Sequence, residues 1–264
     1  MHTREKQLEA FGRVLDILDE LREKCPWDRV QTNETLRQNT IEETYELCDA
    51  LMKNKKNEIC KELGDILLHI VFYSKIGAEK GDFDIKNVCD NLCEKLIYRH
   101  PHVFSETEVS DSSDVVNNWE QLKLREKGRN NRVLSGVPDA LPSIIKAFRI
   151  QEKAANVGFD WDTPQGAIDK IEEEFRELRE EIDMGNKERA EQELGDLLFS
   201  IINVARKFGI FPDNALEKTN KKFIDRFNYV EQASIDKGKR LKEMSMEEMD
   251  LLWDEAKKET KYVE

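Results

Sequence analysis

The 264-residue chain is 39% hydrophobic and 37% charged, and its formal net charge is −13 at pH 7. This composition is typical of a soluble, helix-rich protein. The negative charge argues against generic nucleic-acid binding, which depends on clustered Lys and Arg. The longest apolar stretch, residues 66–73, is interrupted by His69 and is far shorter than the roughly 20 residues of a membrane span. We therefore expect neither nucleic-acid nor membrane binding.

The N-terminus and the cysteines indicate the cellular compartment. The first residues lead into a charged amphipathic pattern without an apolar signal core. The five cysteines all lie in the first half and show no metal-ligand spacing. Reduced thiols of this kind fit a cytoplasmic protein, and that is the expected location.

Apolar residues recur at helical spacing, and no segment alternates as a β-strand does. In the first half the pattern predicts helices over residues 5–24, 35–52, 58–80 and 85–98. A polar loop at 105–114 and a helix at 115–126 around Trp119 follow. Breaker residues near Gly128 and Pro138 then indicate a domain boundary, with domains at 1–128 and 129–264.

The second half repeats the first. It predicts a helix over residues 141–156, an acidic helical pair around Gly185, and a helix over 214–236. The predicted fold class is all-α, with two tandem domains of the four-helix-bundle type. Short helices with broad apolar faces cannot be buried by one pair alone, so each bundle is completed within the chain or by a second copy. We expect a homodimer.

Five acidic residues form a pattern that occurs twice, at a constant offset of 131 residues. The first copy is Glu42, Glu43, Glu46, Glu62 and Asp65, and the second is Glu173, Glu174, Glu177, Glu193 and Asp196. Each copy is symmetric about a turn-like residue, Asn54 in the first and Gly185 in the second. Helices on either side of a turn pair antiparallel, so acids equally far from it lie at one height, about 12 Å away. Four carboxylates therefore converge in each copy.

Crowded carboxylates repel one another, and a hard divalent cation relieves the repulsion. Ligand sets made only of oxygen suit Mg²⁺, with Mn²⁺ as a substitute. The predicted ligands are Glu174, Glu177, Glu193 and Asp196, with a second, weaker set of Glu43, Glu46, Glu62 and Asp65.

The alternative is a solvated helix face, because Glu is a good helix former. Against it, the second pair of acids in each copy leads into an apolar run, where unpaired acids are costly. A mid-helix glycine, Gly64 or Gly195, also stands at the same point of both copies and suggests close approach by another group.

Lys222 and Arg226 are four residues apart on one predicted helix, as a polyphosphate site beside a metal requires. Trp253 lies beside two leucines, which favours a core or interface role over stacking on a base. His69 follows Asp65 by one turn, but its counterpart is Ser200; we interpret it as a core histidine. A hinge or packing role is expected for His100 and His102.

Several motifs together resemble the bacterial MazG nucleoside triphosphate pyrophosphohydrolases over essentially the whole chain. They are Glu-Glu-x-x-Glu followed by Glu-x-x-Asp, together with Cys-Pro-Trp-Asp, Arg-His-Pro-His-Val-Phe, Gly-Phe-Asp-Trp and Asn-Lys-Lys-Phe-x-x-Arg. The resemblance implies a tandem, all-α, usually dimeric protein that uses Mg²⁺ to hydrolyse (d)NTPs to monophosphate and pyrophosphate. It also implies metal ligation by the second acidic set, phosphate contacts from Lys170, Arg189, Lys222 and Arg226, and a nucleotide contact from Trp253.

The expected mechanism is attack of a metal-activated water on the α-phosphorus, with pyrophosphate as the leaving group. Glu173 is a candidate to accept a proton or orient the water. The first copy has Asn39 in place of Lys170 and Glu58 in place of Arg189. We therefore predict that the second copy carries most of the turnover.

Two rival hypotheses come from other classes of protein. A di-iron or di-manganese oxidoreductase also places acids inside a helix bundle, but such sites normally contain Glu-x-x-His, and no such motif occurs in the sequence. The other rival is a non-catalytic helical interaction module whose acids only solvate its surface.

Overall fold

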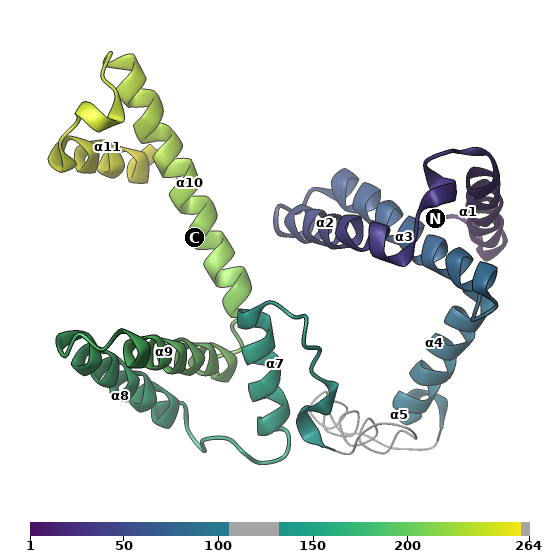
Figure 1. Cartoon of the computed structure of the whole chain (residues 1–264), viewed down its shortest axis with the longest axis horizontal. Helices are drawn as coiled ribbons and strands as arrows, with labels where there is room; N and C mark the ends of the chain where they lie inside the picture. Colours follow the sequence, from purple (N-terminus) through teal and green to yellow (C-terminus); the bar gives the residue numbers. More distant parts are fainter. Residues whose placement is uncertain (106–131, 260–264) are drawn as a thin grey trace. The chain divides into compact units, whose positions relative to one another are not determined.

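The computed structural model describes residues 1–105 and 132–259, and Figure 1 shows helices throughout. The elements are α1 (Arg4–Lys24), η1 (Asp28–Val30), α2 (Asn33–Met52), α3 (Lys56–Lys80), α4 (Ile85–Arg99), α5 (Pro101–Phe104), η2 (Val133–Gly136), α7 (Ser143–Ala155), α8 (Pro164–Asp183), α9 (Lys187–Lys207), α10 (Pro212–Asp236), η3 (Leu241–Glu243) and α11 (Met246–Glu259). No strand occurs in these two ranges, and the all-α prediction is confirmed. None of the described helices has the length and apolarity needed to cross a bilayer.

The chain divides into two compact units, residues 1–115 and 116–264. This division, the predicted boundary at 128/129 and the predicted helix around Trp119 all fall outside the described residues. The boundary and that helix therefore stay predictions. Each unit is described below by itself.

Each unit is built around an antiparallel helical hairpin, α2–α3 in the first and α8–α9 in the second (Figure 1). The turns contain Asn54 with φ 51° and Gly185 with φ 71°. Glycine and asparagine adopt this left-handed conformation most easily. Asn54 is the one non-glycine residue with positive φ in the described ranges. The centres of symmetry of the acidic pattern are thus the actual turns, as predicted.

The first unit buries an apolar cluster between α1, α2 and α3, formed by Leu18, Leu36, Val71, Phe72 and Ile76. The start of α2 is fixed by a capping box in which Thr32 and Thr35 exchange hydrogen bonds between side chain and backbone. Asp84 and Asn87 do the same for α4. These caps explain why α2 begins two residues before its predicted start at Thr35.

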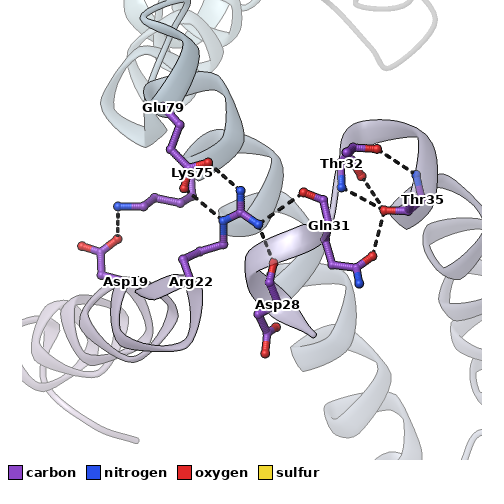
Figure 2. A network of polar contacts seen from close by, with 8 residues as sticks. All are labelled: Asp19, Arg22, Asp28, Gln31, Thr32, Thr35, Lys75 and Glu79. Atoms are coloured by element: carbon purple, nitrogen blue, oxygen red, sulfur yellow. Dashed lines mark hydrogen bonds and ion pairs between the residues drawn. The ribbon is translucent and has the colours of Figure 1, made fainter. Parts of the chain in front are cut away.

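Arg22 connects α1 with α3 and with the segment that leads into α2 (Figure 2). Its Nε and Nη2 atoms donate to the Glu79 carboxylate at 3.0 and 2.5 Å. Its Nη1 atom donates to the backbone oxygens of Asp28 and of Gln31, the latter at 3.2 Å. The guanidinium also lies 5.4 Å from the centre of the Phe72 ring. One partly buried cation therefore holds three segments of the unit together.

In the second unit, α7 packs against α9, and α10 packs against α11 and α7. The Gln151 side chain donates to the backbone oxygen of Phe199 at 2.7 Å and so links α7 to α9. A second apolar cluster joins α10 to α11 through Val230, Met244 and Leu252, with Trp253 packed against it.

The α8–α9 hairpin leaves apolar side chains exposed within the described chain, among them Phe175, Leu194, Leu198 and Ile201. An added Cβ at Gly195, or at Gly64 in the first unit, would meet no atom within 4 Å. No group of the described chain therefore approaches these glycines closely, and close approach by another group stays a prediction. The hairpin has an open apolar face next to Gly195.

Candidate metal and phosphate site

Three carboxylates of the second hairpin converge. Glu174 and Glu177 of α8 and Glu193 of α9 each offer an oxygen, and these oxygens lie within 4.8 Å of one another. Asp196, the fourth predicted ligand, is not in this closest group. Burial, followed by the negative charges of Glu177, Asp196 and Glu174, raises the pKa of Glu193. Asp196 therefore acts on the cluster through its charge, and the donor set fits a hard divalent cation.

The first hairpin repeats this geometry with Glu43, Glu62 and Asp65, whose oxygens also lie within 4.8 Å of one another. Glu46 is not in the group, but it contributes, after burial and Asp65, to a raised pKa of Glu43. Glu62 is only 5% exposed, and its Oε2 atom has no hydrogen-bond partner in the described chain. A buried carboxylate oxygen without a partner is costly, and a bound cation would satisfy it.

A lysine neutralises part of the second cluster. Lys170 Nζ lies 2.9 Å from Glu173 and 2.6 Å from Glu174. The hydrogen bond to Glu174, followed by that to Glu173, raises the pKa of Lys170. The predicted phosphate contact Lys170 is thus paired with two of the acids. The predicted proton acceptor Glu173 is linked to the cluster because the same lysine pairs with both Glu173 and Glu174.

The first cluster has its own lysine, on the opposite helix of its hairpin. Lys61 of α3 lies 3.0 Å from Glu62 and 3.7 Å from Asp65. Alignment of the two copies does not predict this lysine, because Asn39 stands at the position of Lys170. The i, i+4 spacing of Lys61 and Asp65 was the available signal.

Arg189 pairs with Glu181 of α8, with 3.5 Å between Nη1 and Oε1. Glu181 was not predicted as a site residue. The signal was present, since Glu181 and Arg189 are each four residues from Gly185. In the first hairpin, Glu58 at the position of Arg189 instead pairs with Lys55 at 2.8 Å.

Lys222 and Arg226 lie on α10, which packs against α11. The Arg226 guanidinium is 5.9 Å from the centre of the Trp253 ring, and Phe223 contacts the same ring at 5.1 Å. Trp253 therefore packs between helices, as its neighbours indicated. In the described ranges no ion pair joins Lys222 or Arg226 to the acids of α8 and α9. Their phosphate contacts, and the nucleotide contact of Trp253, stay predictions.

The Gly-Phe-Asp-Trp segment anchors the start of α8 to the end of α9. Asp160 pairs with Arg206 at 2.6 Å and with Lys207 at 2.9 Å. Burial opposes ionisation of Asp160, but the hydrogen bonds from these two cations lower its pKa. The Trp161 ring lies so close to Gly166 that an added Cβ there would be 2.4 Å from it. These contacts position the helix that carries Glu174.

The histidines have structural partners. His69 is buried, and its Nδ1 lies 2.9 Å from the Thr40 hydroxyl, which is 2.6 Å from the Tyr73 hydroxyl. Burial lowers the pKa of His69. The interpretation as a core histidine with satisfied hydrogen bonds is confirmed. His100 Nδ1 contacts the backbone oxygen of Leu96 at 2.6 Å, where α4 ends.

The fold and the two clusters define a class of protein: an all-α chain with tandem helical hairpins, each carrying carboxylates suited to a divalent cation. The sequence model of the MazG nucleotide pyrophosphohydrolase domain matches residues 31–104 and again residues 162–231. The chain belongs to the MazG family.

Several bacterial proteins resemble the chain over almost its full length. A nucleoside triphosphate pyrophosphohydrolase of Escherichia coli strain K12 is 38% identical, over 96% of this chain and 98% of the relative. A nucleoside triphosphate pyrophosphohydrolase/pyrophosphatase MazG of Thermotoga maritima is 41% identical, over 94% and 95%. An uncharacterised Bacillus subtilis protein is 41% identical over 94% of this chain, which matches 51% of the relative.

Proposed function

We propose that this MazG-family hydrolase cleaves (d)NTPs between the α- and β-phosphates, with Mg²⁺ at the second acidic cluster, giving (d)NMP and pyrophosphate. Mn²⁺ is the expected substitute. The observation that carries the proposal is the convergence of Glu174, Glu177 and Glu193 within 4.8 Å, with Lys170 held 2.6 Å from Glu174. The proposed location of the enzyme is the cytoplasm.

The roles of the chain's own residues follow from this geometry. Glu174, Glu177, Glu193 and the nearby Asp196 would hold the cation; when bound, Mg²⁺ would supply charge that neutralises the phosphates and acidifies water near the α-phosphorus. Lys170, 2.6 Å from Glu174, would offer its ammonium to a phosphate beside the cluster. Glu173, 2.9 Å from Lys170, accepts the proton of the attacking water. Lys222 and Arg226 supply the remaining positive charge.

The direct test is a panel of NTPs and dNTPs with Mg²⁺, in which pyrophosphate and orthophosphate are measured separately. We expect a monophosphate and one pyrophosphate per turnover. Chelation of Mg²⁺ by EDTA is expected to abolish the reaction, and Mn²⁺ to restore it. Orthophosphate as the sole product would show that a different bond is cleaved and would contradict the proposal.

We assign most of the turnover to the second hairpin. The first retains three converging carboxylates, but its lysine lies on α3 rather than on α2, and the position of Arg189 is taken by Glu58. The first hairpin therefore lacks the positive charge that the second hairpin has at Lys170 and Arg189. The first cluster binds a divalent cation and contributes little to hydrolysis.

We also propose a homodimer in which a second copy covers the open apolar face of the α8–α9 hairpin. Exposed Leu194 and Leu198 flank Gly195 on this face, and apolar surfaces of this kind are normally buried. Two hairpins packed together form a four-helix bundle, which explains why Gly195 has no close neighbour within the described chain.

The dimer predicts an unusual result for Gly195→Ala. In the isolated chain the new methyl group has free space and stabilises the helix by about 1 kcal/mol. At a packed dimer interface it overfills the contact, so we expect dissociation to increase about tenfold. Sedimentation velocity over a dilution series measures this, and Gly12→Ala, which also has free space, is the control. A variant that dimerises like the wild type would contradict the proposed interface.

A further inference from the structure

Glu181 and Arg189 form a pair one layer closer to the turn than the acidic cluster. Each is four residues from Gly185, and each is four residues from a cluster member, Glu177 or Glu193. At 1.5 Å per residue, the pair lies about 6 Å along the hairpin from that layer. Their side chains meet at 3.5 Å. The pair therefore borders the place where the triphosphate is expected.

The two partners differ in their freedom to move. The Glu181 side chain is 12% exposed, whereas that of Arg189 is 68% exposed. One carboxylate oxygen of Glu181, Oε2, is buried and has no hydrogen-bond partner in the described chain. The surrounding protein thus restricts the Glu181 carboxylate, whereas the arginine is a long, solvated side chain whose five N–H donors are mostly available to another anion.

The first hairpin lacks both members of the Glu181–Arg189 pair. The first hairpin has Ala50 at the position of Glu181 and Glu58 at the position of Arg189, yet it keeps its hairpin and its three converging carboxylates. Folding of such a hairpin therefore does not require the pair. The Glu181–Arg189 pair occurs in the second hairpin, to which we assign catalysis.

We propose that Glu181 is a positioning residue that holds the Arg189 guanidinium beside the second cluster, so that the arginine engages the phosphate chain of the nucleotide. This inference rests on the proposed function. Without Glu181, the exposed arginine samples many rotamers and pays more conformational entropy on binding. Because the contact is made in the bound substrate and persists during the reaction, its loss raises KM and leaves kcat nearly unchanged.

The competing role for Glu181 is direct ligation of the metal. Glu181 is four residues nearer the turn than Glu177, about 6 Å along the hairpin from the layer of the carboxylates, which favours positioning. Metal affinity measured without nucleotide distinguishes the two roles. A metal ligand contributes to that affinity, whereas a positioning residue acts only through Arg189.

The test uses four variants of the full-length chain: Glu181→Ala, Glu181→Gln, Arg189→Ala and the double variant Glu181→Ala/Arg189→Ala. Glu180→Ala is the matched control, because it removes the same charge from an exposed neighbouring position. We expect Glu181→Ala to raise KM for ATP about fivefold in the wild-type background and to have no further effect in the Arg189→Ala background. Glu181→Gln, which keeps a hydrogen-bond acceptor, is expected to be intermediate. Calorimetric Mn²⁺ affinity without nucleotide is expected to be unchanged.

An equal rise in KM in the Arg189→Ala background would overturn the proposal, as would weaker Mn²⁺ binding or an equal effect of Glu180→Ala. Glu181→Gln, close in size to the native residue, keeps the test valid if the alanine variant unfolds. Failure of the proposed function has a different signature: the wild-type protein itself would release no pyrophosphate.

Discussion

Replacement of Glu193 by alanine is expected to reduce pyrophosphate release about 100-fold or more. Glu193 is the α9 member of the three carboxylates that converge within 4.8 Å, and mutation even of groups that only support metal ligands typically costs about 10–100-fold. Its removal leaves Asp196 as the remaining predicted ligand on α9, opposite Glu174 and Glu177 of α8. Steady-state kinetics with ATP and dUTP at saturating Mg²⁺ measures the effect.

The matched change in the first hairpin is Glu62→Ala, because Glu62 occupies the equivalent position at the offset of 131 residues. We expect this variant to retain most of the activity. Circular dichroism and thermal melting of both variants establish that each is folded. Equal losses of activity in the two folded variants would show that turnover is not concentrated in the second hairpin.

Replacement of Arg22 by alanine is expected to destabilise the first unit by about 3 kcal/mol. The side chain is 10% exposed, and its loss leaves two backbone oxygens, those of Asp28 and Gln31, without its donors. It also leaves Glu79 without the hydrogen bond that lowers its pKa. Native-state hydrogen exchange, read by mass spectrometry on peptides from α1 and α3, locates the effect in this unit.

Arg13→Ala is the control for this experiment, since Arg13 is an exposed residue on the same helix. We expect its exchange protection to match the wild type, because surface substitutions usually change stability by less than about 0.5 kcal/mol. Unchanged protection of α3 in Arg22→Ala would mean that the network in Figure 2 does not hold α1 against α3.

Much of the architecture was predictable because helices leave periodic signals. The spacing of the acids placed both turns correctly, at Asn54 and Gly185, since antiparallel helices pair residues that are equidistant from a turn. Helix boundaries were predicted within about two residues, where cap chemistry such as that of Thr32 set the difference. The interpretation of His69 as a core residue was also correct, and its partners are now known.

The site was predictable only in part. The family resemblance implied a role for Lys170, but Lys61 was not predicted, because the same charge reaches the first cluster from the other helix. Glu181 was not predicted, because the acidic pattern is defined by acids common to both copies and Ala50 takes the place of Glu181 in the first copy. The close approach expected at Gly195 has no counterpart within the described chain.

The amino-acid sequence alone determined the helical class, the duplication and the two hairpins on which acids converge, because these depend on residue spacing along regular helices. Tertiary structure decided which carboxylates come closest, that Lys170 is held by Glu174, and that Arg189 meets Glu181. Such choices depend on side-chain rotamers and on competition between neighbouring charges. Burial sets the strength of that competition, and burial is a property of the packed chain rather than of residue spacing.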